Sequence, residues 1–199
     1  MNWTRRDLLS AIGVALGLPL GFSLKGLRRK SDFAPLRPPG AGSEEDFLAA
    51  CIRCGQCVEA CPWGTLKLDG AAAGLGIGAP TLTPRHIPCY VCDGYDELKC
   101  IAVCPTTALH PPEKLTDIHM GTAVVDEKQC TAFLGAICRA CSQACPIPGA
   151  IVLDELQRPI IRARTCIGCG ICEHVCPTRP AAITIRPASA GPSAGGARA

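Results

Sequence analysis

The sequence predicts a loop-rich α+β fold in which short antiparallel strands and short helices wrap bound groups. Its 199 residues include 16 cysteines, whereas aromatic residues make up only 4 %. A chain of this composition has few large side chains with which to form a hydrophobic core. Its fold must therefore be stabilised by groups bound to the cysteine sulfur atoms. Glycine (21) and proline (18) are abundant, which indicates tight, irregular connections between short elements.

The amino-terminal segment has the features of an export signal. The pair Arg5-Arg6 is followed by an apolar stretch from Leu8 to Leu24, a pattern that resembles a twin-arginine signal. We therefore expect residues 1–30 to form a signal or anchor helix. The protein would then be periplasmic, either free or anchored to the inner membrane.

Composition also predicts where the folded part lies. Prolines and glycines dominate the stretch before Ser43, so we expect a stiff linker over residues 31–42. The folded domain is predicted over residues 43–186, followed by a disordered tail over 187–199. The formal net charge of +3 consists of +5 in the first thirty residues and −2 in the rest. No basic stripe runs through the body, so a nucleic-acid partner has little support.

The cysteines form four quartets along the predicted domain. Each quartet ends in Cys-x3-Cys-Pro, and the first and last have the full spacing Cys-x2-Cys-x2-Cys-x3-Cys-Pro. This spacing is typical of proteins that bind paired 4Fe-4S clusters, in which the cysteine before proline reaches the neighbouring cluster. The sequence therefore predicts four 4Fe-4S clusters. The quartets are Cys51, Cys54, Cys57 and Cys61; Cys89, Cys92, Cys100 and Cys104; Cys130, Cys138, Cys141 and Cys145; Cys166, Cys169, Cys172 and Cys176.

Short apolar stretches flank the quartets and predict strands. Two such stretches precede quartets three and four, and three others follow quartets one, three and four. This repetition predicts two ferredoxin-like modules, but periodicity does not determine how the strands pair. The predicted strands are 123–125, 160–161, 66–68, 150–153 and 182–185.

Disulfide bridges and zinc account for the cysteines less well. A disulfide framework would not reproduce the spacing of cluster ligands four times. Zinc accepts four thiolates, but its sites usually combine two separated Cys-x2-Cys pairs. The four histidines form no metal-ligand pair and no nucleophile–base arrangement, so we predict no catalytic residues and no substrate site.

Several stretches resemble the NapG/MauM family of ferredoxin-type electron-transfer proteins. They are residues 36–41 (LRPPGA), 47–57 (FLAACIRCGQC), 87–89 (IPC), 121–125 (GTAVV) and 166–170 (CIGCG). The resemblance implies a carrier that takes electrons from a membrane-bound, quinol-oxidising ferredoxin-type protein. It would pass them to a periplasmic redox enzyme or cytochrome, with nitrate reductase as the acceptor in one branch. MauM-type members accompany methylamine oxidation.

The resemblance also implies a nested pairing of the quartets, one with four and two with three. The four ligand sets would then be Cys51, Cys54, Cys57 and Cys176; Cys166, Cys169, Cys172 and Cys61; Cys89, Cys92, Cys100 and Cys145; Cys130, Cys138, Cys141 and Cys104. Three functions stay open at this point: an electron relay, an accessory or maturation protein for methylamine dehydrogenase or another redox enzyme, and a structural metal-binding module.

Overall fold

The computed structural model describes residues 35–188. These residues belong to one compact unit, and the description below concerns them. The predicted signal or anchor over residues 1–30 and the tail from residue 189 onward lie outside the described residues. Within them, no helix has both the length and the apolar character needed to cross a membrane.

The first module, residues 36–110, is built around one hairpin. Strands β1 (Leu66–Leu68) and β2 (Pro80–Leu82) pair antiparallel, with Leu66 opposite Leu82, and the 3-10 helix η1 (Ala71–Gly76) lies in the connection between them. A bridge between Ala41 and Leu109 brings the two ends of the module together. The helices are α2 (Glu44–Ala50), α3 (Gln56–Glu59) and α4 (Lys99–Ala102).

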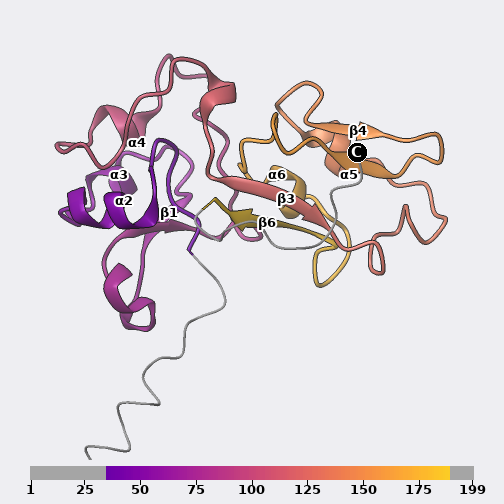
Figure 1. Ribbon diagram of the computed structural model, residues 1–199, viewed down its shortest axis with the longest axis horizontal. Coiled ribbons are helices and arrows are strands. Elements are labelled where there is room, and N and C mark those ends of the chain that lie inside the picture. The colour runs from indigo at the N-terminus through magenta and orange to yellow at the C-terminus, as the bar shows by residue number, and fades with distance from the viewer. Residues whose placement is uncertain (1–34, 189–199) are drawn as a thin grey trace, which may run out of the picture. The chain divides into compact units, whose positions relative to one another are not determined.

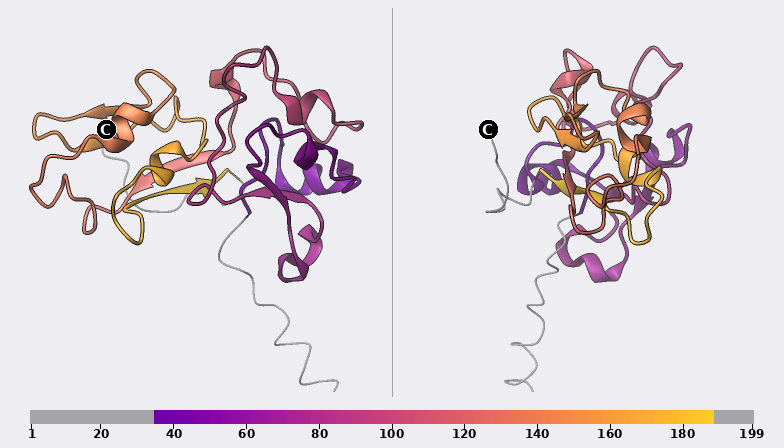
Figure 2. Two further views of the ribbon diagram at one scale, coloured as in Figure 1. Left: turned by 180° about the vertical axis from the view of Figure 1, so that it is seen from behind. Right: turned by 90° about the vertical axis from the view of Figure 1, so that its right-hand side faces the viewer.

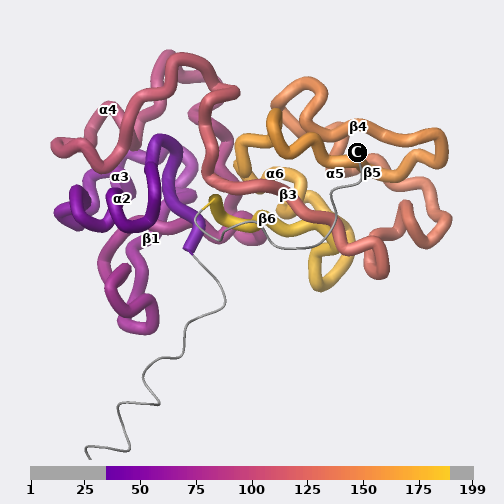
Figure 3. Tube along the Cα trace, in the orientation of Figure 1, coloured from indigo at the N-terminus to yellow at the C-terminus, as the bar shows by residue number. Residues whose placement is uncertain are grey.

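The second module, residues 120–187, repeats this plan with longer strands. Its first strand β3 (Gly121–Val125) pairs antiparallel with its last strand β6 (Ile183–Pro187), and they lie side by side in Figure 1 and in the left view of Figure 2. Between them, β4 (Ile151–Leu153) and β5 (Pro159–Ile161) form a hairpin. The helices are α5 (Ala140–Ala144) and α6 (Ile171–His174). The chain passes from one module to the other between α4 and β3, through the short 3-10 helix η2 (Leu115–Asp117) (Figure 3).

The predicted strands are confirmed, and the sheets are smaller than those of most domains. Each of the five predicted apolar stretches coincides with a strand, namely β1, β3, β4, β5 and β6. Strand β2 was not predicted, because it begins with a proline and offers only two further residues before the next turn. Proline is tolerated at the first residue of a strand, where it removes no essential ladder bond.

Residues 36–41 belong to the folded module, which corrects the predicted linker. Leu36 pairs with Leu82 as an isolated bridge and is 6 % exposed, and Pro38 and Pro39 are fully buried. Gly40 has φ +82°, and a Cβ there would overlap the carbonyl oxygen of His110. The prolines and glycine thus form a buried turn. The domain also extends one residue beyond the predicted end, since Pro187 pairs with Gly121.

Arg37 is the buried charge that holds this turn in place. Its side chain is 6 % exposed and forms ion pairs with Glu44 at 2.7 Å and with Asp69 at 2.9 Å. It also donates to the carbonyl of Pro80 at 3.0 Å and lies over the ring of Phe47. These contacts join the turn to α2, to the residue that follows β1 and to the start of β2.

Replacing Arg37 by methionine should destabilise the first module by about 3 kcal/mol, because it leaves two carboxylates without their buried partner. The substitution Arg158→Met is a matched control. Arg158 pairs with Asp154 at 2.7 Å, but its side chain is 37 % exposed, so we expect a loss below about 1 kcal/mol. Denaturant-induced unfolding, followed by circular dichroism, measures both. Equal losses in the two variants would contradict a structural role for the Arg37 network.

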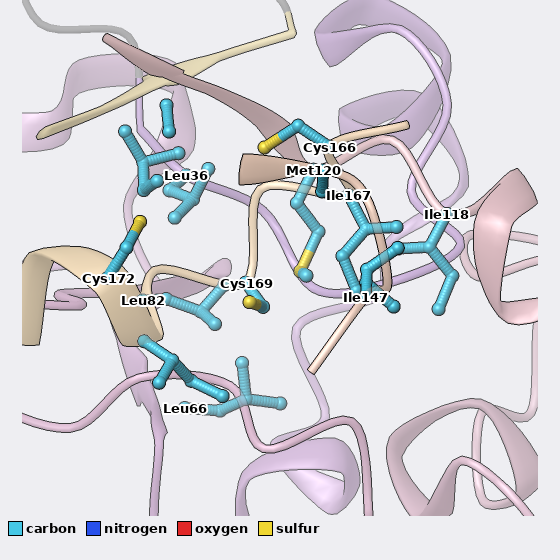
Figure 4. Close-up of a cluster of buried hydrophobic side chains, with 14 of the residues drawn as sticks. Leu36, Leu66, Leu82, Ile118, Met120, Ile147, Cys166, Ile167, Cys169 and Cys172 are labelled. Atoms are coloured by element: carbon cyan, nitrogen blue, oxygen red, sulfur yellow. The ribbon is translucent and has the colours of Figure 1, made fainter. Parts of the chain in front are cut away.

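The buried core is small and contains cysteines among its aliphatic residues. Figure 4 shows Leu36, Leu66 and Leu82 of the first module in the same cluster as Cys169 and Cys172 of the second. One continuous core therefore runs through both modules, and cysteine side chains form part of it.

Candidate metal centres

Four very short helices place the cysteines. Helices α3, α4, α5 and α6 each contain the third cysteine of a quartet, and the fourth cysteine follows the end of the same helix. Gly55 and Gly170 directly precede α3 and α6 and have φ +78° and +81°, a conformation that glycine adopts without steric cost. The chain before each of these two helices can therefore turn sharply and direct the first two cysteines toward the third. The fourth cysteine of each quartet faces a different hollow.

In the first module, the sulfur atoms gather into two groups, which we call sites A and B. Each site lines a hollow that also contains aliphatic or aromatic side chains. Trp63 and Tyr90 cover site B, with ring centroids 4.7 Å apart. Site A consists of Cys51, Cys54, Cys57 and Cys104, and site B of Cys61, Cys89, Cys92 and Cys100.

The second module contains the corresponding sites C and D. Site D lines a hollow closed by Val125, Pro159 and Ile183. Site C is recognised from thiols that lie near one another. Cys172 has Cys169, Cys166 and Cys145 as neighbours, besides Cys141 of site D, and Cys145 lies near Cys166 and Cys169. Site C consists of Cys145, Cys166, Cys169 and Cys172, and site D of Cys130, Cys138, Cys141 and Cys176.

These groups correct the predicted nested pairing. The exchange of the fourth cysteine takes place between quartets one and two and between quartets three and four. Cys104 and Cys61 exchange within the first module, while Cys176 and Cys145 exchange within the second. The reason is the chain path: helix α3 packs against α4, and α5 against α6, so each module closes on itself.

Four cysteines line the hollow at each of sites A, B and D. The equal ligand number indicates one kind of occupant. Among residues 35–188, no three Cys, His, Asp or Glu side chains converge closely enough to hold a single metal ion. All sixteen cysteines lie in this range as free thiols. Four thiols around one hollow give the ligand number of a 4Fe-4S cluster.

Burial raises the pKa of seven thiols in the sites. Burial first, and neighbouring thiols second, raise the pKa of Cys57 to about 11 and that of Cys141 to about 11. Burial raises the pKa of Cys89 to about 12. Because iron binds thiolate, filling these sites must release protons from the cysteines.

Two of the fourth cysteines have the opposite shift. Burial alone would raise the pKa of Cys61, but the backbone N–H groups of Thr65, Trp63 and Leu66 outweigh it and lower the pKa. At Cys176, the hydroxyl of Thr178 lies 3.2 Å from the sulfur and, with nearby backbone N–H groups, lowers the pKa against the effect of burial. N–H and O–H groups directed at a sulfur favour its anionic form, which is the form that binds iron–sulfur clusters.

Hydroxyl groups lie beside two of the sulfur atoms and were not predicted. Thr106 lies 3.7 Å from the sulfur of Cys104, as Thr178 does from Cys176 at 3.2 Å. The sequence does contain a signal for these hydroxyl groups. Quartets two and four are followed by Pro-Thr, whereas quartets one and three are followed by Pro-Trp and Pro-Ile. The residue after the proline therefore distinguishes sites A and D from sites B and C.

Comparison with known proteins agrees with this arrangement. The family model described as "4Fe-4S dicluster domain" matches residues 50–108 and residues 136–180. The first match contains all the cysteines of sites A and B, and the second contains all those of sites C and D except Cys130. The chain is thus an iron–sulfur protein of the ferredoxin type.

Similar proteins identify the family within the ferredoxin type. The chain is 42 % identical over 194 residues to "Ferredoxin-type protein NapG" of Escherichia coli, covering 91 % of this chain and 80 % of that protein. It is 39 % identical over 203 residues to "Methylamine utilization ferredoxin-type protein MauM" of Paracoccus denitrificans, covering 94 % and 89 %. The MauM protein of Methylobacillus flagellatus is 40 % identical over 205 residues, covering 96 % and 86 %. The chain belongs to the NapG/MauM family of ferredoxin-type electron-transfer proteins.

Proposed function

We propose that the protein carries four 4Fe-4S clusters, one at each of sites A to D, and relays single electrons between two redox partners. The observation that carries this proposal is the set of four-cysteine groups, each completed by a cysteine from the neighbouring quartet. A 4Fe-4S cluster supplies one-electron chemistry with little rearrangement.

The chain's own residues would bind the clusters and keep them at fixed positions. Each of the helices α3 to α6, together with the residues that follow it, carries ligands of two sites, so the two sites of a module cannot move independently. Aliphatic and aromatic side chains such as Trp63 and Phe47 exclude water from the hollows. The N–H and O–H groups at Cys61 and Cys176 offset the negative charge of the bound thiolates.

We further propose that the protein works in the periplasm. The electron donor would be a membrane-bound, quinol-oxidising ferredoxin-type protein, and the acceptor a periplasmic redox enzyme or cytochrome, such as nitrate reductase. Residues 1–30 would direct export or anchor the chain to the inner membrane. The relation to NapG supports this assignment, and the arginine pair before an apolar stretch supports export of a folded, cluster-containing protein.

An accessory role in the maturation of methylamine dehydrogenase or another redox enzyme is the second candidate. It rests on the relatives named for methylamine utilization. A structural metal-binding module is the third. Reduction of the purified protein by a quinol pool, in the presence of the membrane partner, separates the relay from the maturation role.

Anaerobic iron and acid-labile sulfide analysis, with electron paramagnetic resonance (EPR) during reductive titration, tests the proposal. We expect about 16 iron and 16 sulfide per chain and about four reducible clusters, since each cluster holds four of each element. A correctly folded protein that contains zinc and no sulfide would refute both redox functions.

Thr178 gives a local test of the proposed cluster at site D. Replacing it by valine removes the hydroxyl beside Cys176, so the reduction potential of one cluster should fall, because hydrogen bonds to the sulfurs favour the more negative reduced state. A potentiometric titration monitored by EPR measures this. Thr178→Ser should restore the potential, and Thr184→Val, on the exposed side of β6, should leave all potentials unchanged. A potential that does not move in Thr178→Val would show that this hydroxyl does not influence a cluster.

A further inference from the structure

The four sites lie in a row with B and C in the middle. All five buried cysteines belong to these two sites, namely Cys92, Cys100, Cys166, Cys169 and Cys172, whereas the ligands of A and D are half-buried or, for Cys54, exposed. Helix packing gives the order. Helix α3, with Cys57 of site A, packs against α4, with Cys100 of site B. Likewise α5, with Cys141 of site D, packs against α6, with Cys172 of site C.

Sites B and C meet through the backbone of two ligands. The N–H of Cys89 donates a hydrogen bond of 2.9 Å to the carbonyl oxygen of Cys169. Cys89 is the first ligand of quartet two, and Cys169 is the second ligand of quartet four. The preceding residue, Pro88, is fully buried and accepts a hydrogen bond of 2.9 Å from the hydroxyl of Thr65. The contact is thus fixed on the side of the first module.

Arg85 holds the same segment to the second module. Its guanidinium donates to the carbonyl oxygens of Glu173 at 2.8 Å, of Cys176 at 2.9 Å and of Thr178 at 3.0 Å. These are backbone groups at the end of α6 and just beyond it, where helical carbonyls have no partner within the helix. One side chain of the first module therefore supplies hydrogen-bond donors to the free carbonyl groups at the end of α6. This helix and the residues after it carry ligands of both C and D.

The backbone of quartet four is shaped to receive this segment. Gly170 follows Cys169, and a Cβ at this position would overlap the Cβ of Pro84. Residues 84–89 therefore contact the second module at three points: Pro84 against Gly170, Arg85 at the end of α6, and Cys89 at Cys169. These residues form a closely packed strap that joins the two halves of the row.

We propose that residues 84–89 form the bridge over which electrons cross between the two modules, with Arg85 as the positioning residue that holds Cys89 against Cys169. This inference rests on the proposed function, since it requires clusters at B and C. Crossing makes and breaks no bond: one electron leaves one inner site and arrives at the other, and no proton accompanies it. Sites A and D are then the two ends at which partners exchange electrons with the protein.

EPR of a two-site background tests the bridge. The substitutions Cys54→Ser and Cys138→Ser remove one ligand each from sites A and D, so that only B and C keep four cysteines. The fully reduced background should show magnetic interaction between two neighbouring clusters, seen as splitting or broadening of the spectrum. Adding Arg85→Gln should weaken this interaction at unchanged iron content, and adding Arg158→Gln, a control in the β4–β5 connection, should leave it intact.

Hydrogen exchange of the full chain gives an independent measurement. In Arg85→Gln, the amides of residues 85–92 and 168–178 should exchange faster than in the parent protein, while those of 51–61 should not. Unchanged exchange in these segments, or an undiminished magnetic interaction, would overturn the proposal. Absence of iron from the parent protein would instead refute the proposed function, before any variant is compared.

Discussion

The double variant Cys54→Ser/Cys104→Ser should lose one cluster, not two. Both cysteines belong to site A, although they come from different quartets and lie 50 positions apart in the sequence. Once one ligand is missing, removal of the other has little further effect on iron content. We therefore expect about 12 iron and 12 sulfide per chain in each single variant and in the double variant, compared with about 16 in the parent protein.

A second double variant should lose two clusters and serves as the control for the first. Cys54→Ser/Cys176→Ser affects sites A and D, so it should lose two clusters and retain about eight iron. The nested pairing makes the reverse prediction, because it assigns Cys176 to the site of Cys54 and Cys104 to another. Iron and sulfide analysis of the two purified double variants therefore distinguishes the two arrangements. A loss of eight iron from Cys54→Ser/Cys104→Ser would contradict the sites described here.

The sequence predicted that the sixteen cysteines gather in groups of four, but not which quartets exchange their fourth cysteine. Spacing requires that three cysteines of a quartet face one cluster and that the cysteine before proline face another. Because all four quartets end in the same Cys-x3-Cys-Pro, nothing in the pattern says which quartet exchanges with which. The grouping depends on long-range packing, of α3 on α4 and of α5 on α6, and no local signal encodes it.

The strands next to the cysteines could also be predicted, whereas the role of residues 36–41 could not. A short run of apolar residues beside each quartet is a local property, and each predicted run became a strand. A Pro-Pro-Gly run is equally typical of an exposed linker and of a buried turn. What decides between them is Arg37, whose partners Glu44 and Asp69 lie 7 and 32 positions away. A single arginine in a sequence does not reveal such partners.

The glycine pair Gly55 and Gly170 offers a matched test of how tightly the modules are joined. Each glycine follows the second cysteine of a Cys-x2-Cys-Gly-x-Cys run, and their φ angles are +78° and +81°. Alanine at either position therefore meets the same local strain, about 1 kcal/mol. The surroundings differ. A Cβ at Gly55 has no heavy atom within 4 Å, whereas one at Gly170 would overlap the Cβ of Pro84.

Gly170→Ala should therefore destabilise the protein by about 3 kcal/mol, and Gly55→Ala by about 1 kcal/mol, because only the first forces the strap away from quartet four. If the difference affects the unfolding rate alone, the clusters should bleach in denaturant up to roughly thirtyfold faster in Gly170→Ala than in Gly55→Ala. Loss of visible absorption under anaerobic conditions measures this rate. Equal bleaching rates in the two variants would mean that the contact with Pro84 gives way without cost, and that the modules are joined more loosely than their packing indicates.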